Sequence, residues 1–150
     1  MVRRRSVAVL LAGVAAIIAA CTPAPSQDPT VGQKVRAVEL SITADARFTP
    51  DRIAVHAGET IRFVVENPTS SDHELFIGPA AEQEMHHAKH LGLPPVEQAA
   101  MSHFGYGIFL PAFGDGVLDY HFAEPGDVLI GCHLPSHYEG GHVAIVVVGP

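Results

Sequence analysis

The chain has 150 residues, of which 47% are hydrophobic and 17% are charged, and its formal net charge is −7 at pH 7. This length suits one domain, and the composition is too apolar for a disordered chain. The negative charge argues against a nucleic-acid partner, because such proteins need clustered Lys and Arg to neutralise phosphates. Two cysteines exclude a disulfide-dense scaffold and a four-thiolate zinc site, whereas ten histidines are many for this length. The composition therefore indicates a small domain suited to metal binding.

The N-terminal segment has the layout of a secretory signal peptide. Three arginines at positions 3 to 5 precede an apolar run from Val7 to Ala20, and this run is shorter than the about 20 residues of a transmembrane helix. The run ends at Cys21 after two alanines, which resembles a bacterial lipobox. We expect residues 1–20 to be removed and Cys21 to carry a lipid that anchors the chain to a bacterial membrane, on its extracytoplasmic side. A plain signal peptide that is cut nearby is the alternative.

The next segment, residues 21–34, contains three prolines among polar residues and predicts an extended tether. The folded domain is then expected to occupy residues 35–150. With Cys21 lipidated, Cys132 has no partner for an intramolecular disulfide. An unpaired thiol in an oxidising compartment is a liability unless the protein uses it.

The sequence of the domain predicts a series of short strands. β-Branched, aromatic and alternating residues form runs that are separated by Gly, Pro and Asn turn signals. The expected strands are residues 35–44, 52–56, 60–66, 73–77, 117–122, 127–132 and 143–148. Such a series predicts an all-β sandwich with Greek-key connections.

One insertion, at about residues 80–116, interrupts this pattern. Residues 80–91 are rich in Ala, Glu, Gln and Met, with Pro79 before them and Gly92 after them, and these are helix start and stop signals. The chain from there to Gly116 is punctuated by Gly and Pro, and we expect a long loop. Loops of that length inside a compact domain are usually functional or mobile.

The C-terminal part carries the sharpest chemical signal. Cys132, His137 and His142 are spaced five residues apart, and Cys132 ends an expected strand. His73 opens an upstream strand that can lie beside it in a sandwich. A thiolate with two imidazoles and a weak axial ligand is the type 1 copper arrangement. A tetrahedral zinc site would accept the same donors, so ligand types alone leave both metals open.

An ordered set of motifs, which covers most of residues 35–148, resembles the cupredoxin family, in particular its single-domain, plastocyanin-like copper proteins. The resemblance implies a Greek-key β-sandwich of about seven to eight strands that binds one copper ion. It also implies that His73, Cys132 and His137 are the equatorial copper ligands. The motifs are Phe48-Thr49-Pro50, residues 53–58, residues 61–67, residues 72–75, Pro125-Gly126 and Cys132-x4-His137-Tyr138-Glu139-x-Gly141.

His142 departs from the family pattern, because cupredoxins usually have Met five residues after the second His. An imidazole is a stronger donor than a thioether, so it should favour Cu(II), pull copper out of the trigonal plane and lower the reduction potential. We therefore expect a tetragonal, green or red centre that resembles the red copper site of nitrosocyanin in having a strong axial donor. In the alternative, His142 points to solvent.

A second group of histidines and methionines lies in the insertion. His86 and His90 are four residues apart on the expected helix, so they share a face and can clamp a metal. The full candidate set for a second copper is Met85, His86, His87, His90, Met101 and His103. The alternative is a solvated helix face with no ligand role.

We expect no ligand role for the residues that adjoin the first site in the sequence. His133 follows Cys132 directly, should point to the opposite face and is expected to be structural. Asp72, Glu74 and the acidic residues of the helix form either a docking rim for a cationic partner or, by default, a solvated face.

The sequence predicts a membrane-anchored copper protein rather than an enzyme, and two roles compete. The first is one-electron transfer to a redox partner protein, with His137 as the exit. The second is copper capture, tolerance or delivery, with a copper donor or acceptor as the partner. A redox enzyme of the red-copper kind is a third, weaker alternative. We expect a monomer, because no long apolar stripe is left over.

Overall fold

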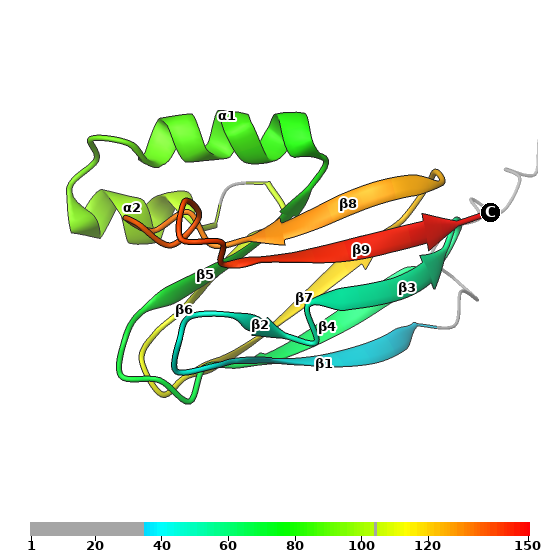
Figure 1. The fold of residues 1–150 in the computed structure, drawn as a ribbon, viewed down its shortest axis with the longest axis horizontal. Coiled ribbons are helices and arrows are strands. Elements are labelled where there is room, and N and C mark those ends of the chain that lie inside the picture. The colour runs from blue at the N-terminus through cyan, green and yellow to red at the C-terminus, as the bar shows by residue number, and fades with distance from the viewer. Residues whose placement is uncertain (1–34, 104) are drawn as a thin grey trace, which may run out of the picture. The chain divides into compact units, whose positions relative to one another are not determined.

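In the computed structural model, residues 35–103 and 105–150 are described, and they form a sandwich of two β-sheets (Figure 1). The predicted signal peptide, the lipidated Cys21 and the tether lie outside the described residues and stay predictions. Neither helix in the described part is long and apolar enough to cross a membrane.

The first sheet has four strands in the order β2-β1-β4-β7, and the second has five in the order β3-β9-β8-β5-β6. The pairs β1–β4 and β3–β9 are parallel, and the other pairs are antiparallel. The strands are β1 (Arg36–Ile42), β2 (Phe48–Thr49), β3 (Arg52–His56), β4 (Thr60–Glu66), β5 (His73–Gly78), β6 (Gly107–Leu110), β7 (Asp115–His121), β8 (Gly126–Gly131) and β9 (Val143–Gly149).

The predicted all-β sandwich is confirmed, with nine strands in the described residues instead of seven or eight. All seven expected strands are present, with ends shifted by a few residues. The prediction missed β2 and β6, which have only two and four residues. Runs this short carry too little periodicity to separate them from the turns beside them.

The core lies between the sheets, and strict alternation along the strands builds it. In β4, for example, Ile61, Phe63 and Val65 are fully buried, whereas Arg62 and Val64 point outward. Successive strand residues point to opposite faces, so one face of each sheet can be apolar while the other is solvated. The metal-ligand candidates come from the chain segments at one end of this core.

The insertion differs from its prediction. The expected helix is present as α1 (Ala80–His90), but residues 92–116 are not one long loop. They hold a second helix, α2 (Pro95–Met101), followed by β6. The prolines at 94 and 95 resemble turn signals in the sequence, but proline is equally favourable at the start of a helix, and α2 begins at Pro95.

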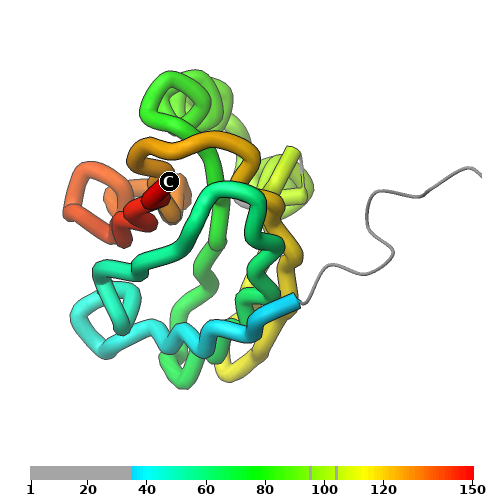
Figure 2. Tube along the Cα trace, turned by 90° about the vertical axis from the view of Figure 1, so that its right-hand side faces the viewer, coloured from blue at the N-terminus to red at the C-terminus, as the bar shows by residue number. Residues whose placement is uncertain are grey.

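Helix α1 packs outside the second sheet, against β5 and β8 (Figures 1 and 2). Its Gln83 amide donates to the backbone carbonyls of Leu129 at 2.8 Å and Phe76 at 3.2 Å. The Phe76 ring stacks on the imidazole of His86, with centroids 3.9 Å apart. The helix is therefore fixed directly over two strands that adjoin the metal-ligand candidates. Strand β5 begins at His73, and β8 ends just before Cys132.

Candidate metal centre

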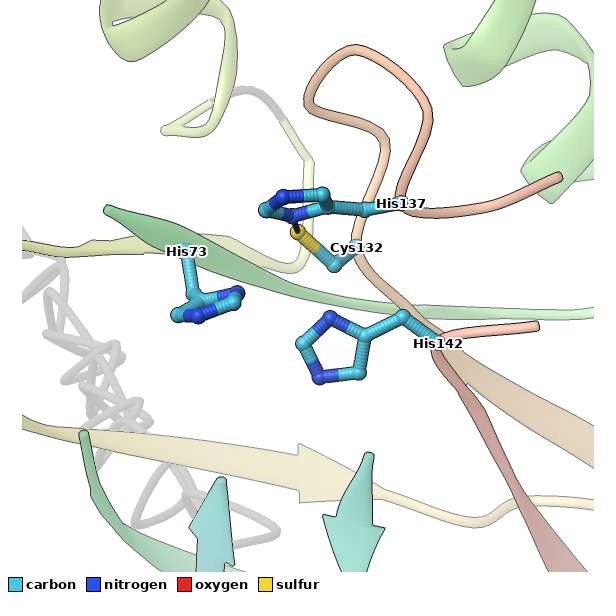
Figure 3. Close-up of side chains that lie close together, drawn as sticks. All are labelled: His73, Cys132, His137 and His142. Atoms are coloured by element: carbon cyan, nitrogen blue, oxygen red, sulfur yellow. Dashed lines mark hydrogen bonds between the residues drawn. The ribbon is translucent and has the colours of Figure 1, made fainter. Parts of the chain in front are cut away.

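Four side chains converge at one end of the sandwich: His73, Cys132, His137 and His142 (Figure 3). One donor atom from each lies within 4.8 Å of the others. His73 is the first residue of β5, Cys132 follows β8, His142 precedes β9, and His137 comes from the loop between them. The Cys132 Sγ and His137 Nδ1 atoms are 3.2 Å apart. The structure thus brings together the whole set that the sequence suggested for the first site.

The loop between Cys132 and His142 closes on itself through backbone hydrogen bonds. The Cys132 amide donates to the carbonyl of His142 at 3.2 Å, and the His142 amide donates to the carbonyl of His137 at 3.0 Å. Gly141 has a φ of +84°, a left-handed conformation that favours glycine. A Cβ there would also meet the Arg47 guanidinium, which donates to the Gly141 carbonyl. These bonds hold three of the four donors at fixed spacing.

A chain of hydrogen bonds fixes the protonation of His73. The Asn67 amide group donates to the Ser71 and Pro111 carbonyls, so its oxygen is left to accept from the Thr69 hydroxyl at 2.7 Å. The Thr69 oxygen then accepts from His73 Nε2–H at 3.2 Å. The proton therefore resides on Nε2, and the lone pair of Nδ1 faces the other donors. That nitrogen is buried and has no hydrogen-bond partner, as expected for a metal ligand with an outer-shell support.

His142 is buried inside the centre, with 1% of its surface exposed, so its ring does not point to solvent. It packs against Phe48, with ring centroids 4.2 Å apart. Both of its ring nitrogens are buried without a hydrogen-bond partner. A buried polar atom without a partner costs on the order of 1–3 kcal/mol, and a bound cation would supply a partner for one of the two nitrogens.

The electrostatics suit a cation rather than a proton at this centre. Burial, followed by the neighbouring imidazoles, lowers the pKa of His73 to about 4 and that of His142 to about 3. Burial also lowers the pKa of His137. It raises the pKa of the Cys132 thiol to about 12, although the Glu74 amide donates to Sγ at 3.3 Å. At neutral pH the imidazoles are therefore uncharged and able to ligate, whereas the thiol must give up its proton when a metal binds.

The donor set fits copper chemistry. A thiolate suits Cu(I), and imidazoles suit both oxidation states, so three imidazoles and one thiolate can hold copper through a redox cycle. The same four donors would satisfy tetrahedral zinc. The buried donors without partners thus show that the residues fit a metal.

The suggested second set is only partly assembled. Helix α1 places His86 and His90 side by side, with their Nε2 atoms 3.1 Å apart. Met85 is 58% exposed, His103 is exposed, and His87 turns to Glu139 at 3.3 Å. Met101 is the last residue of α2 and is half-buried.

The third member of this cluster is Glu74, which the sequence interpretation placed on an acidic rim or a solvated face. That interpretation is wrong, because Glu74 is fully buried and its carboxylate contacts both His86 and His90. The alternation of β5 indicates the face on which Glu74 lies but not which element covers that face. His73 faces the first centre, so the next residue must face the opposite side, where α1 packs.

His133 points away from the first centre, on the side of α1, and is fixed within the fold. Its Nε2 lies 2.6 Å from the Gln83 side-chain oxygen, and its ring stacks on Tyr138 with centroids 4.2 Å apart. Burial, followed by the three histidines of α1, lowers its pKa to about 3.

Known proteins resemble this chain in both sequence and fold. The copper-resistant cuproprotein CopI of Rubrivivax gelatinosus is 30% identical over 113 residues, which are 75% of this chain and 66% of that protein, just under two thirds of its length. CopI of Pseudomonas aeruginosa is 28% identical and aligns with 88% of this chain and 90% of its own. No protein-family model matches the chain.

Among solved structures, dithionite-reduced auracyanin from Roseiflexus castenholzii superposes with a TM-score of 0.65 at 18% identity. The match covers 79% of this chain and all of auracyanin. The two-sheet topology agrees with this likeness, and the chain has the cupredoxin fold.

Proposed function

We propose that this protein binds one copper ion through His73, Cys132, His137 and His142 and contributes to copper tolerance by sequestering that ion. The observation that carries the proposal is the set of buried ring nitrogens without partners, on His73 and His142, beside a buried thiol. Both sequence relatives are copper-resistant cuproproteins, which favours copper over zinc and tolerance over other roles.

The chain's own residues prepare the centre before any metal arrives. Thr69 keeps the proton of His73 on the outer nitrogen, and the closed loop holds Cys132, His137 and His142 together. Preorganised donors bind more tightly than mobile ones, because less conformational entropy is lost on binding. Bound copper would supply a one-electron couple.

His142 favours holding copper over passing electrons at high potential. An imidazole in place of the usual thioether stabilises Cu(II) relative to Cu(I) and so lowers the reduction potential. A site that holds both oxidation states without an easy reduction suits capture. The expected spectrum is that of a tetragonal, green or red centre.

Electron transfer is the second candidate, and it rests on one feature of the surface. His137 is only half-buried, and together with His73 it lines a hollow of about 300 Å³ beside Thr69 and Pro68. A redox partner that docks in this hollow would come within contact of a ligand ring. The proposal therefore includes either a redox partner or a copper donor or acceptor protein at this face.

The proposed location is outside the cytoplasm, with the lipid on Cys21 as a membrane anchor. The support is the sequence of residues 1–21, with its basic start, apolar run and lipobox-like end. Mass spectrometry of the mature chain would test this: a diacylglyceryl adduct on a chain that starts at Cys21 is expected. An unmodified N-terminus elsewhere would contradict it.

The decisive experiment is a copper titration of the purified full chain, followed by visible absorption and electron paramagnetic resonance (EPR). We expect intense thiolate-to-copper charge-transfer bands that saturate at one equivalent and resist an equal concentration of zinc. Cells that carry the wild-type chain should then survive a copper load that kills cells carrying Cys132→Ser. Absence of the bands from a chain with a reduced thiol would contradict the copper centre. Reversible voltammetry without a survival difference would favour electron transfer.

A further inference from the structure

A second group of donor atoms lies on the other face of β5, beneath helix α1. Glu74, His86 and His90 bring a carboxylate and two imidazoles within 4.8 Å of one another, and all three side chains are buried. The two Nε2 atoms are 3.1 Å apart, and His90 Nε2 lies 3.3 Å from Glu74 Oε2. His86 Nε2 contacts the other carboxylate oxygen.

The basic groups that face the buried Glu74 carboxylate are imidazoles. Its side chain is fully buried, and within the described residues no Lys or Arg forms an ion pair with it. Its polar neighbours are His86, His90 and the Ser102 hydroxyl, 3.1 Å from Oε2. A buried carboxylate without a cationic partner costs several kcal/mol, so such groups are normally paired or bind a metal.

We propose that Glu74, His86 and His90 form a second metal site that binds a divalent cation, with copper(II) preferred. The donors are two nitrogens and one oxygen with no sulfur, a set that suits divalent first-row metals and disfavours Cu(I). Among those metals, copper(II) binds such donors most tightly. This site lies outside the cupredoxin centre, shares no ligand with it and does not depend on the function proposed above.

The separations fit ligands of one ion. With metal–ligand bonds of about 2.05 Å, donors 3.1 and 3.3 Å apart subtend angles of about 98° and about 107°. These angles lie between square-planar and tetrahedral geometry. Two imidazole nitrogens that face each other this closely can share at most one proton between them, whereas a cation accepts both lone pairs.

Neighbouring residues hold the proposed ligands in place and leave a path by which a cation can enter. Ser102, just after α2, holds one carboxylate oxygen, and the stacked Phe76 ring fixes the plane of His86. A hollow of about 240 Å³ reaches His86 from the surface between Phe76, Met85 and Lys89. Ligand count, spacing, second-shell support and an entry path are the features that mark a workable metal site.

The test is copper(II) binding by the purified full chain beyond the first equivalent. We expect a second equivalent with an ordinary EPR signal, a large hyperfine splitting and no charge-transfer band. Glu74→Gln keeps the shape of the side chain and removes the charge. It should abolish the second equivalent while the charge-transfer band of the first centre persists, which also reports folding. His90→Asn should do the same, and His121→Ala, an exposed histidine on the first sheet, should bind like the wild type.

Two further sets of variants locate the site. In Cys132→Ser the second equivalent should remain, so a failure of the first centre and a failure of this site can be told apart. His103→Ala and Met85→Ala should leave the second equivalent intact. Retention of the second equivalent in both Glu74→Gln and His90→Asn, its loss in His103→Ala or Met85→Ala, or saturation of the wild type at one copper would each overturn the proposal. A second site that prefers zinc in direct competition would overturn the choice of copper(II).

Discussion

The two faces of strand β5 bear two groups of donor atoms that differ in chemistry. On one face, His73 joins Cys132, His137 and His142 at the end of the core. On the other face, Glu74 joins His86 and His90 under helix α1. The first group contains sulfur, and the second contains only nitrogen and oxygen.

Both groups arise from the same local rule. His73 and Glu74 are neighbours in β5, and the alternation of the strand sends them to opposite faces. Cys132 and His133, just after β8, diverge in the same way, with His133 on the side of α1. The Glu74 amide even donates to Cys132 Sγ, so the groups are separated by a single backbone segment. A shift of one residue along a strand therefore decides which of the two groups of donor atoms a side chain joins.

The largest expected effect that separates the two groups comes from removal of the sulfur. Cys132→Ser should abolish the charge-transfer absorption completely, because only a thiolate gives such bands with copper. Binding of copper at the Glu74 cluster should be unaffected. The matched control is Cys21→Ser, which removes the other cysteine and should leave the absorption unchanged. Visible titration of both variants checks this, and a band that survives in Cys132→Ser would place the sulfur ligand elsewhere.

Acid should destabilise the protein once copper has been removed by chelation. Burial holds the pKa of His73 at about 4 and those of His133 and His142 at about 3, well below the ordinary value of 6.5. The unfolded chain therefore takes up protons below pH 6.5 that the folded chain does not, so stability falls as pH falls through this range. Each such group contributes up to about 1.4 kcal/mol per pH unit. Urea unfolding at pH 7 and pH 5 should differ by at least about 2 kcal/mol.

Histidines on both sides of the second sheet enter this prediction, because His133 lies on the side of α1, and variants separate them. His133→Gln should remove part of the acid sensitivity and leave the spectrum of the first centre intact. His142→Gln should remove part of it and alter that spectrum. Equal stability of the wild type at the two pH values would show that the buried rings accept protons without penalty.

The hydroxyl behind His73 offers a smaller and more specific perturbation. Thr69→Val removes the acceptor for His73 Nε2–H while keeping the shape of the side chain. Loss of an outer-shell partner typically weakens metal binding by about 10–100-fold. Thr69→Ser keeps the hydroxyl and should bind like the wild type, and the Glu74 cluster should not respond to either change. Competition with a chelator of known affinity measures this, and equal affinity of the Val and Ser variants would exclude the role of the hydroxyl.

The sequence was sufficient to predict the first group of donors, because most of them lie close together in the chain. The spacing of Cys132, His137 and His142 falls in one segment, and His73 stands at the start of a recognisable strand. Alternation also identified seven strands and the sandwich. The missed elements, β2, β6 and α2, are short or begin with residues that equally indicate turns.

The second group could be predicted only in part, for a physical reason. The i and i+4 spacing identified His86 and His90, since helical geometry is local. The third member depends on which face of β5 the helix covers, and that is set by tertiary packing of α1 through Gln83 and Phe76. No pattern in residues 80–103 indicates this, so the sequence alone does not predict that Glu74 is buried.

The smallest expected change tests the fourth ligand of the first centre. His142→Met restores the usual cupredoxin residue at a position that is buried against Phe48. A thioether binds Cu(II) more weakly than an imidazole and tolerates Cu(I), so the spectrum should shift toward blue and the reduction potential should rise. A rise of about 60 mV corresponds to a tenfold change in the ratio of Cu(I) to Cu(II) affinity. The control is His121→Met, which introduces the same thioether at an exposed position and should leave the potential unchanged. Voltammetry and EPR follow both variants, and an unchanged potential and hyperfine splitting in His142→Met would show that the buried imidazole does not ligate copper.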